Sequence, residues 1–394
     1  MKVNDLLEIS LLEVGKVIAN LFYNPLFYWF FIFIFILSIQ RIRSERNFFG
    51  IKIFGVFHEW KRTLLISLFS GFVVSIISIG TNIVFNYDIF TVLLISIFLM
   101  SLTFNPAYLS PVYTIGLTYL ILLFIPLINN EFNYLTELPF SNIFTHLTIF
   151  LGIFLIVESL LVKRLNNNQV PPELKLSNRG IWIGFLNAKK ATMIPFVVLL
   201  PTEPLGLITK ILPNLNIGEM EFSIMIVPFI LGFNYKIINE PFLKAKNKIA
   251  KQTFGLAIIV LAFAIGSIYL PILSFIGIIL ALLYKELMSI TYKSKIKKEE
   301  SYYRPLNEGI RILAILPSSP AERLNLKVGE TIMKVNNQSV NDETEFYRAL
   351  QNKSASFKLN VLNHEGEIKF ITGSFYETDD HNLGLVFPNK PYNS

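Results

Sequence analysis

The composition of the chain changes within residues 272–305, which read ILSFIGIILALLYKELMSITYKSKIKKEESYYRP. Residues 272–289 are almost continuously apolar, whereas residues 293–300 read KSKIKKEE and begin a sequence of ordinary water-soluble composition. The 394 residues are 53% hydrophobic and 16% charged, with a mean hydropathy of +0.52, which is too apolar for soluble domains alone. We therefore predict a membrane domain over residues 21–292, a basic linker over 293–304 and a soluble domain over 305–394.

Apolar segments long enough to cross a membrane recur before this boundary. A spanning helix needs about twenty mostly apolar residues, because hydrocarbon cannot hydrogen-bond an exposed backbone. The segments that meet this standard are residues 21–39, 64–85, 89–104, 108–128, 143–162, 193–212, 222–238, 254–269 and 272–289. The sequence therefore predicts a polytopic α-helical membrane bundle of about nine transmembrane helices.

The charge of the connecting segments predicts their side of the membrane. Residues 40–63, 163–190 and 285–304 each carry six Lys or Arg, and residues 236–251 carry five. The alternate connections at 86–88, 129–142 and 213–221 carry none. By the positive-inside rule the basic segments are cytoplasmic, which places the C-terminal domain in the cytoplasm. We also expect these basic segments to contact anionic lipids.

The first twenty residues leave the number of spans open. Leu7, Leu11, Val14 and Ile18 have the spacing of an amphipathic helix, so residues 1–20 fit a helix lying on the membrane interface. Eight spans are then as compatible with the sequence as nine, and the side of the N-terminus stays undecided.

Glutamates in or near the apolar segments are candidate functional residues, because a buried charge is expensive in a membrane. Glu158, Glu240 and Glu286 adjoin basic residues or a loop, and we predict that they are interfacial. Glu203 differs, since the sequence PTEP at residues 201–204 would break or kink a helix beside a carboxylate. Broken helices of this kind form transporter sites. The alternative is a short helix or a re-entrant turn with Glu203 facing water on the outer side.

The pattern after Gly309 is that of a small α/β domain, with short apolar or alternating strands between polar turns. Strands are predicted at residues 309–316, 328–337, 356–362 and 367–373. Short helices are predicted at 321–326, where Ser319 can cap the first turn, and at 343–351.

This domain resembles the bacterial PDZ family. Ser318, Ser319, Pro320 and Ala321, followed by Leu326, Gly329, Ile332, Val335 and Asn336, are similar to the Ser-Pro-Ala…Gly-Leu…Gly-Asp…Ile…Asn-Gly signature of that family. The chain departs from it at Asn325, Glu330 and Asn337. The resemblance implies a PDZ-like fold over about ninety residues, ending the polytopic membrane bundle in a small cytoplasmic α/β domain.

The resemblance also implies a peptide-binding groove, because PDZ domains add an extended peptide as a strand beside a helix. Its loop would be Asn382, Leu383, Gly384, Leu385 and Val386, placed near the C-terminus as in circularly permuted bacterial members. The helix at 343–351 would form the other wall, with Phe346, Tyr347 and Leu350 as contact residues. An ordinary closing strand at 382–387, and core packing for two of the three helix residues, are the alternatives.

Enzyme chemistry lacks its usual residues. The chain has no cysteine and four histidines, and His58-Glu59 is followed by Trp60, Lys61 and Arg62, so the second histidine of a His-Glu-x-x-His zinc motif is absent. No serine elbow or phosphate-binding glycine loop with lysine is present. The basic excess comes without a nucleic-acid recognition pattern. We expect no enzyme, no cofactor, no metal and no nucleic-acid partner.

The whole arrangement, several spans followed by one PDZ-like domain in about 400 residues, resembles the MinJ-like cell-division topological determinants of low-GC Gram-positive bacteria. That resemblance implies a membrane scaffold, enriched at the septum and poles, that bridges DivIVA-like and MinC/MinD-like partners and could form homo-oligomers. Two other functions stay open: a transporter or intramembrane regulator centred on Glu203, and an adaptor for a membrane protease.

Overall fold

The computed structural model describes residues 15–61, 63–80, 87–128, 142–177, 180–201, 214–217, 220–298, 301–351, 356–375, 382–389 and 391–392. Most of the interfacial helix predicted over residues 1–20 therefore lies outside the described residues. Residues 15–23 are described and are helical.

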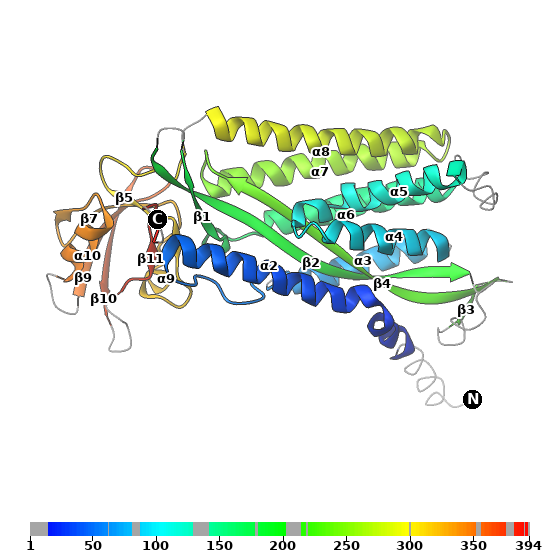
Figure 1. Ribbon diagram of the computed structural model, residues 1–394, viewed down its shortest axis with the longest axis horizontal. Helices are drawn as coiled ribbons and strands as arrows, with labels where there is room; N and C mark the ends of the chain where they lie inside the picture. The colour runs from blue at the N-terminus through cyan, green and yellow to red at the C-terminus, as the bar shows by residue number, and fades with distance from the viewer. Residues whose placement is uncertain are drawn as a thin grey trace.

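Seven apolar helices run along the long axis of the molecule (Figure 1). They are α2 (Pro25–Phe49), α3 (Leu64–Gly80), α4 (Tyr87–Ser101), α5 (Pro111–Ile128), α6 (Asn142–Lys163), α7 (Phe242–Gly266) and α8 (Ile272–Lys298). Four of them, α2, α6, α7 and residues 272–292 of α8, are long and apolar enough to cross a membrane. The seven helices overlap seven of the nine predicted spans, and for α3, α4 and α5 the crossing of the membrane stays a prediction.

Local sequence sets the ends of these helices. The Asn24 side chain accepts a hydrogen bond from the Leu26 N–H at the start of α2, and Pro25 occupies the first position, where a missing N–H costs nothing. Gly50 ends α2 in a left-handed conformation with φ 71°, which glycine adopts without steric cost. The sequence thus terminates α2 where the chain turns beneath the C-terminal region.

The predicted spans 193–212 and 222–238 are wrong, because their described residues 193–201 and 222–237 belong to a long antiparallel hairpin. Strand β2 (Trp182–Pro201) pairs along its length with β4 (Met220–Ile237), from Leu186 opposite Ile237 to Pro201 opposite Phe222. The short strands β1 (Pro172–Leu176) and β3 (Asn214–Ile217) extend the sheet at opposite ends, in the order β1-β2-β4-β3. The hairpin runs through the helical part along its long axis (Figure 1).

Helix α3 covers the outer edge of β2, which matters because an uncovered strand edge is not tolerated in hydrocarbon. The Val197 N–H donates to Ser75 Oγ at 2.8 Å, and Gly71 lies so close that an added Cβ would meet the Pro195 carbonyl oxygen at 2.0 Å. Backbone groups alternate in direction along a strand, so the nitrogen of Pro195 faces the same edge as that of Val197. Proline leaves no N–H to be unpaired there.

The 3-10 turn η1 (Pro106–Leu109) between α4 and α5 packs against β4. Asn234 donates to Asn105 Oδ1 at 3.0 Å, and a Cβ on Gly232 would meet the Pro106 carbonyl oxygen at 2.8 Å. The broad faces of the hairpin are buried as well, with Phe229 stacked on Phe154 of α6 at 4.1 Å between ring centroids. The helices therefore enclose the hairpin.

The C-terminal region contains two small antiparallel sheets and two helices. The larger sheet has the order β10-β9-β7-β5, with β8 paired to β7, and the smaller one pairs β11 with β6. The elements are β5 (Ile310–Arg311), β6 (Ala314–Ile315), α9 (Pro320–Arg323), β7 (Thr331–Val335), β8 (Gln338–Ser339), α10 (Glu343–Gln351), β9 (Ser356–Leu362), β10 (Ile368–Ser374) and β11 (Leu385–Val386).

The junction between the two parts is packed at the C-terminal end of the predicted basic linker, residues 293–304. The chain continues α8 through Lys298, and Tyr303 is fully buried. The Tyr303 carbonyl accepts from the Gly184 N–H at 2.9 Å, and Asn167 donates to the Val328 carbonyl at 2.7 Å. The C-terminal region is therefore seated directly on the ends of β2 and α6.

Candidate functional site

A pocket of about 290 Å³ lies at the junction between α2 and the C-terminal region. Residues from both predicted walls of the peptide groove line it, namely Tyr347 of α10 and Asn382, Leu385 and Val386 of the loop and strand β11. Residues 382–386 and α10 are thus brought together, as the sequence predicts for a groove. That the pocket binds a peptide stays a prediction.

Strand β11 turns one edge toward this pocket. Leu316 donates its backbone N–H to the Gly384 carbonyl at 2.8 Å, and Leu385 is then in register with Ile315 of β6. Because backbone groups alternate in direction along an antiparallel strand, the N–H and C=O of Leu385 point away from β6. This edge is positioned to pair with an added strand.

Asn382 and Gly384 shape the end of the groove. Gly384 has φ +74° and packs so closely on Ser319 that an added Cβ would lie 2.4 Å from the Ser319 Cβ, so only glycine fits. Asn382 Oδ1 accepts hydrogen bonds from the Gly384 N–H and the Tyr347 hydroxyl, both at 2.9 Å. The Asn382 oxygen thus occupies an acceptor position that a peptide carboxylate would need.

The remaining predicted contact residues lie in the hydrophobic core. Phe346 is fully buried and packs edge-on against Phe387 at 5.2 Å between ring centroids, and Leu350 is buried on the same face of α10. Leu383 is also fully buried. These three side chains lie behind the walls of the pocket and do not line it. For the helix residues Phe346 and Leu350, the core-packing alternative therefore holds, whereas Tyr347 lines the pocket.

Buried acid–base groups lie at the α10 wall. Burial is the main cause that raises the pKa of Glu343 above its ordinary value, against a hydrogen bond from Asn389 that lowers it. Burial, with the nearby Glu343 carboxylate, raises the pKa of Tyr347 to about 12. Tyr347 is therefore a neutral hydrogen-bond donor at physiological pH.

The opposite wall comes from the end of α2 and from Tyr392, which the sequence did not predict. Phe48, Phe49 and Ile51 line the pocket, and the Tyr392 N–H donates to the Phe48 carbonyl at 3.1 Å. The groove is therefore built against the membrane part. A partner segment entering it would lie close to the end of a spanning helix.

Contacts between α2 and residues 50–59 hold the end of α2 against the C-terminal region. Arg41 pairs with Glu45 at 2.8 Å and Glu59 at 2.6 Å, and all three side chains are buried. Glu45 Oε2 also accepts the backbone N–H groups of Ile53 and Phe54, which pack in a cluster with Val386. Glu59, which follows His58 in the incomplete zinc motif, thus belongs to an ion-pair network.

A second charge network lies in the membrane part. Glu158, which the sequence predicts to be interfacial, is fully buried inside the protein, and its depth in the membrane stays a prediction. Lys285 pairs with Glu158 Oε1 at 2.6 Å, and the carboxylate also accepts hydrogen bonds from Ser110 at 2.6 Å and Tyr235 at 2.9 Å. A buried carboxylate needs such partners, because desolvation of an unpaired charge costs several kcal/mol.

The other glutamates have different surroundings. Glu286 is exposed and accepts a hydrogen bond from the Tyr113 hydroxyl at 2.8 Å, and Glu240 lies 3.7 Å from Lys248. Glu203 lies outside the described residues, and so does the broken-helix hypothesis built on it. Among the described residues, no three His, Asp or Glu side chains gather in a way that could hold a metal ion.

These features define a membrane protein with an enclosed β-hairpin and a C-terminal region of antiparallel sheets that closes a groove against the membrane part. The chain is 28% identical over 380 residues to the cell division topological determinant MinJ of Bacillus subtilis, covering 95% of each chain. It is also 26% identical over 85 residues to a probable MinJ of Lacticaseibacillus paracasei, which is 21% of this chain and 23% of that protein. No protein-family model matches the chain. The resemblance to MinJ that the sequence predicts is confirmed.

Proposed function

We propose that this chain is a membrane-anchored scaffold of cell division, which recognises a partner protein by adding an extended segment of it to β11. The carrying observation is the similarity to MinJ along 380 residues, which supports a role in determining the division site. The groove offers a way to bind such a segment, since the backbone edge of Leu385 and the side chain of Tyr347 line the same pocket.

The position of the groove favours partners that are themselves bound to the membrane. The pocket includes Phe48 and Phe49 at the end of α2, so a bound segment would be held near the bilayer surface. Confining two partners to one surface raises their effective concentration, so that a weak contact suffices. DivIVA-like and MinD-like proteins are the proposed partners, in a PDZ-like mode and without enzyme activity.

Copurification of division proteins with the tagged full-length chain tests this function. Tyr347→Ala removes a groove wall, and Arg348→Ala, the next residue on the exposed side of α10, is the matched control. Loss of a buried aromatic contact predicts a roughly tenfold lower yield of partner with Tyr347→Ala and an unchanged yield with Arg348→Ala. Equal recovery of DivIVA-like and MinD-like proteins with both variants would count against the groove.

A further inference from the structure

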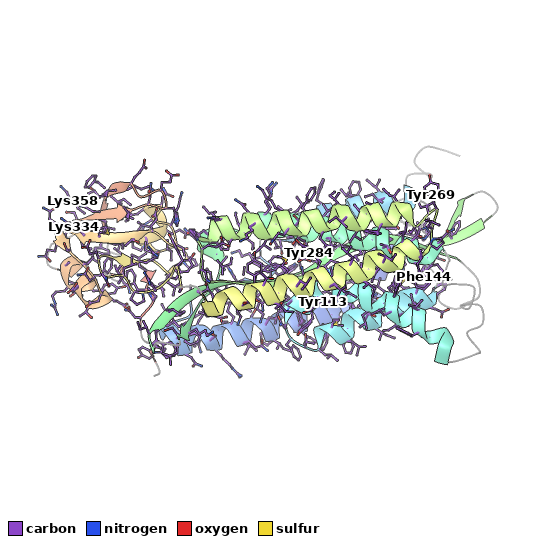
Figure 2. All side chains as sticks on the ribbon, turned by 90° about the horizontal axis from the view of Figure 1, so that it is seen from above. Tyr113, Phe144, Tyr269, Tyr284, Lys334 and Lys358 are labelled. Carbon is purple, nitrogen blue, oxygen red and sulfur yellow. The ribbon has the colours of Figure 1, made fainter. Side chains whose placement is uncertain are left out.

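A polar pocket of about 350 Å³ lies inside the helical part, separate from the groove. It is lined from the turn η1 and the start of α5, from β4, and from residues 285–292 of α8. Tyr113 and Tyr284 lie on the two sides of α8, about midway along the helical part (Figure 2). The pocket lies on the Tyr113 side of α8.

The pocket extends from the end of the apolar stretch of α8 into the helical part. The apolar stretch of α8 ends at Tyr292, and Lys285 is seven residues further in, which is about 10 Å along a helix. Tyr108, Tyr113 and Tyr292 line the pocket between these levels. Tyrosine is typical of the layer where lipid headgroups meet hydrocarbon.

The floor of the pocket supplies hydrogen-bond donors. Lys285 Nζ carries three N–H groups, and its acceptors among the described residues are Glu158 Oε1 at 2.6 Å and the Tyr235 hydroxyl at 2.9 Å. One N–H thus remains to donate into the pocket, and Lys236 adds a second ammonium group to the lining. These groups suit a phosphate oxygen.

The mouth of the pocket supplies acceptors. Glu286 is exposed, and its carboxylate holds the Tyr113 hydroxyl at 2.8 Å. Asn234 donates to Asn105, while its own Oδ1 is buried with no partner among the described residues. A carboxylate and an amide oxygen beside tyrosine rings suit an ammonium group. Since Glu158 balances Lys285, the remaining charges of Lys236 and Glu286 sum to zero.

A second, mostly apolar pocket lies beside this one on α8. This pocket of about 220 Å³ lies between α7 and α8 and shares Met288 and Tyr292 with the first. Its other lining residues are Tyr284, Leu287, Thr291, Lys248 and Gln252. Leu287 is 61% exposed, although α8 is an apolar helix. A polar pocket beside a mostly apolar groove is complementary to a molecule with a charged head and a hydrocarbon tail.

We propose that these two neighbouring pockets bind an aminophospholipid, with its phosphoethanolamine headgroup in the polar pocket and an acyl chain between α7 and α8. The phosphate lies toward Lys285 and Lys236, and the ammonium group toward Glu286 and Asn234. A zwitterionic headgroup matches the balanced charge of the lining, whereas a net anionic headgroup leaves Glu286 facing a negative charge. The site is independent of the peptide groove and of the division function.

Native mass spectrometry of the full-length protein in detergent tests this site, with equal amounts of phosphatidylethanolamine, phosphatidylglycerol and phosphatidylcholine added. The wild type is expected to retain phosphatidylethanolamine preferentially. Glu286→Gln keeps an acceptor for the Tyr113 hydroxyl but removes the charge, and is expected to reduce this retention about tenfold. Glu308→Gln, an exposed carboxylate of the C-terminal region, is the control and should leave retention unchanged.

Two further arms distinguish a lipid from its headgroup and guard against misfolding. Ser289→Trp fills the polar pocket and is expected to abolish selective retention while the protein still elutes as a single folded species. Soluble phosphoethanolamine should not displace the lipid, because it cannot occupy the apolar groove. Equal retention of the three lipids, no effect of Glu286→Gln, or displacement by the soluble headgroup would overturn the proposal.

Discussion

Lys285 and Glu158 are 127 residues apart in the sequence and form one buried ion pair. Their pairing cannot be read from their neighbours in the chain, because they lie in two different helices that are distant in sequence. The pair instead joins α6 to α8, and Tyr235 joins both to the hairpin through a 2.9 Å hydrogen bond to Glu158. One ion pair thus holds three elements together.

Removal of one member of this pair should destabilise the protein strongly. Lys285→Met leaves the Glu158 carboxylate buried without its cation, which costs about 3–5 kcal/mol. The double variant Lys285→Met with Glu158→Leu should recover much of this loss, because no charge stays buried. Thermal unfolding of the full-length protein in detergent measures both. A single variant as stable as the wild type would contradict the buried pair.

Glu343 predicts a dependence of stability on pH. Burial raises its pKa in the folded protein, so the stabilisation associated with its neutral form is present below the ordinary pKa and is lost as the pH rises through the raised pKa. At pH 7 the buried carboxylate is therefore unfavourable. Glu343→Gln should unfold at a higher temperature than the wild type at pH 7, with the difference fading toward about pH 4, the ordinary pKa of Glu.

Thermal scans between pH 4 and pH 7.5 check this expectation. Glu365→Gln, an exposed carboxylate in the same region, serves as the control and should show little change at any pH. A Glu343→Gln protein less stable than the wild type at pH 7 would mean that the hydrogen bond with Asn389 outweighs the burial of the charge.

At the scale of elements, the hairpin of β2 and β4 separates what the sequence predicts from what it does not. The length of an apolar run does not distinguish a helix from a strand that is buried on both faces, because such a strand also has an unbroken apolar sequence. The available signals were Pro195 and Pro228 within the runs, together with β-branched residues such as Val197 and Val198. The β-branched residues favour strands, and each proline is compatible with a strand position whose nitrogen faces the outer edge.

The predicted alternation of sides, which stays a prediction, does not depend on this distinction. A long strand carries the chain from one end of the molecule to the other as a helix does, so the alternation of basic and uncharged connections was preserved. The C-terminal elements were predicted more closely, since Ser319 caps α9 as expected and α10 spans residues 343–351. The wall formed by Phe48, Phe49 and Tyr392 could not be predicted, because it depends on contacts between distant segments.

The absence of cysteine makes the hairpin directly testable. Lys189 lies opposite Asn234 in register, and both side chains are half-buried, so cysteines at these two positions should form a disulfide with a membrane-permeable oxidant. The control pairs Lys189→Cys with Met225→Cys, nine residues from Asn234 or about 30 Å along a strand. Cross-linking of the control pair, or of neither pair, would contradict the register.

At the scale of the whole molecule, the packed junction distinguishes this protein from a soluble domain on a flexible tether. Gly184, Asn167 and Phe48 of the membrane part each share a backbone or side-chain hydrogen bond with the C-terminal region. The walls of the groove come from both parts, so a movement of either part would change the shape of the groove. We expect partner recognition to require the membrane part as well as the sheets.

Localisation of the fluorescently tagged full-length chain in dividing Bacillus subtilis cells that lack their own MinJ tests the central claim most directly. Enrichment at the septum and poles, with recruitment of MinD that is lost in Tyr347→Ala and kept in Arg348→Ala, is the result that a division scaffold acting through this groove predicts. A uniform membrane signal for the wild type, with no effect on MinD, would contradict the division function. Normal recruitment by Tyr347→Ala would contradict the role of the groove alone.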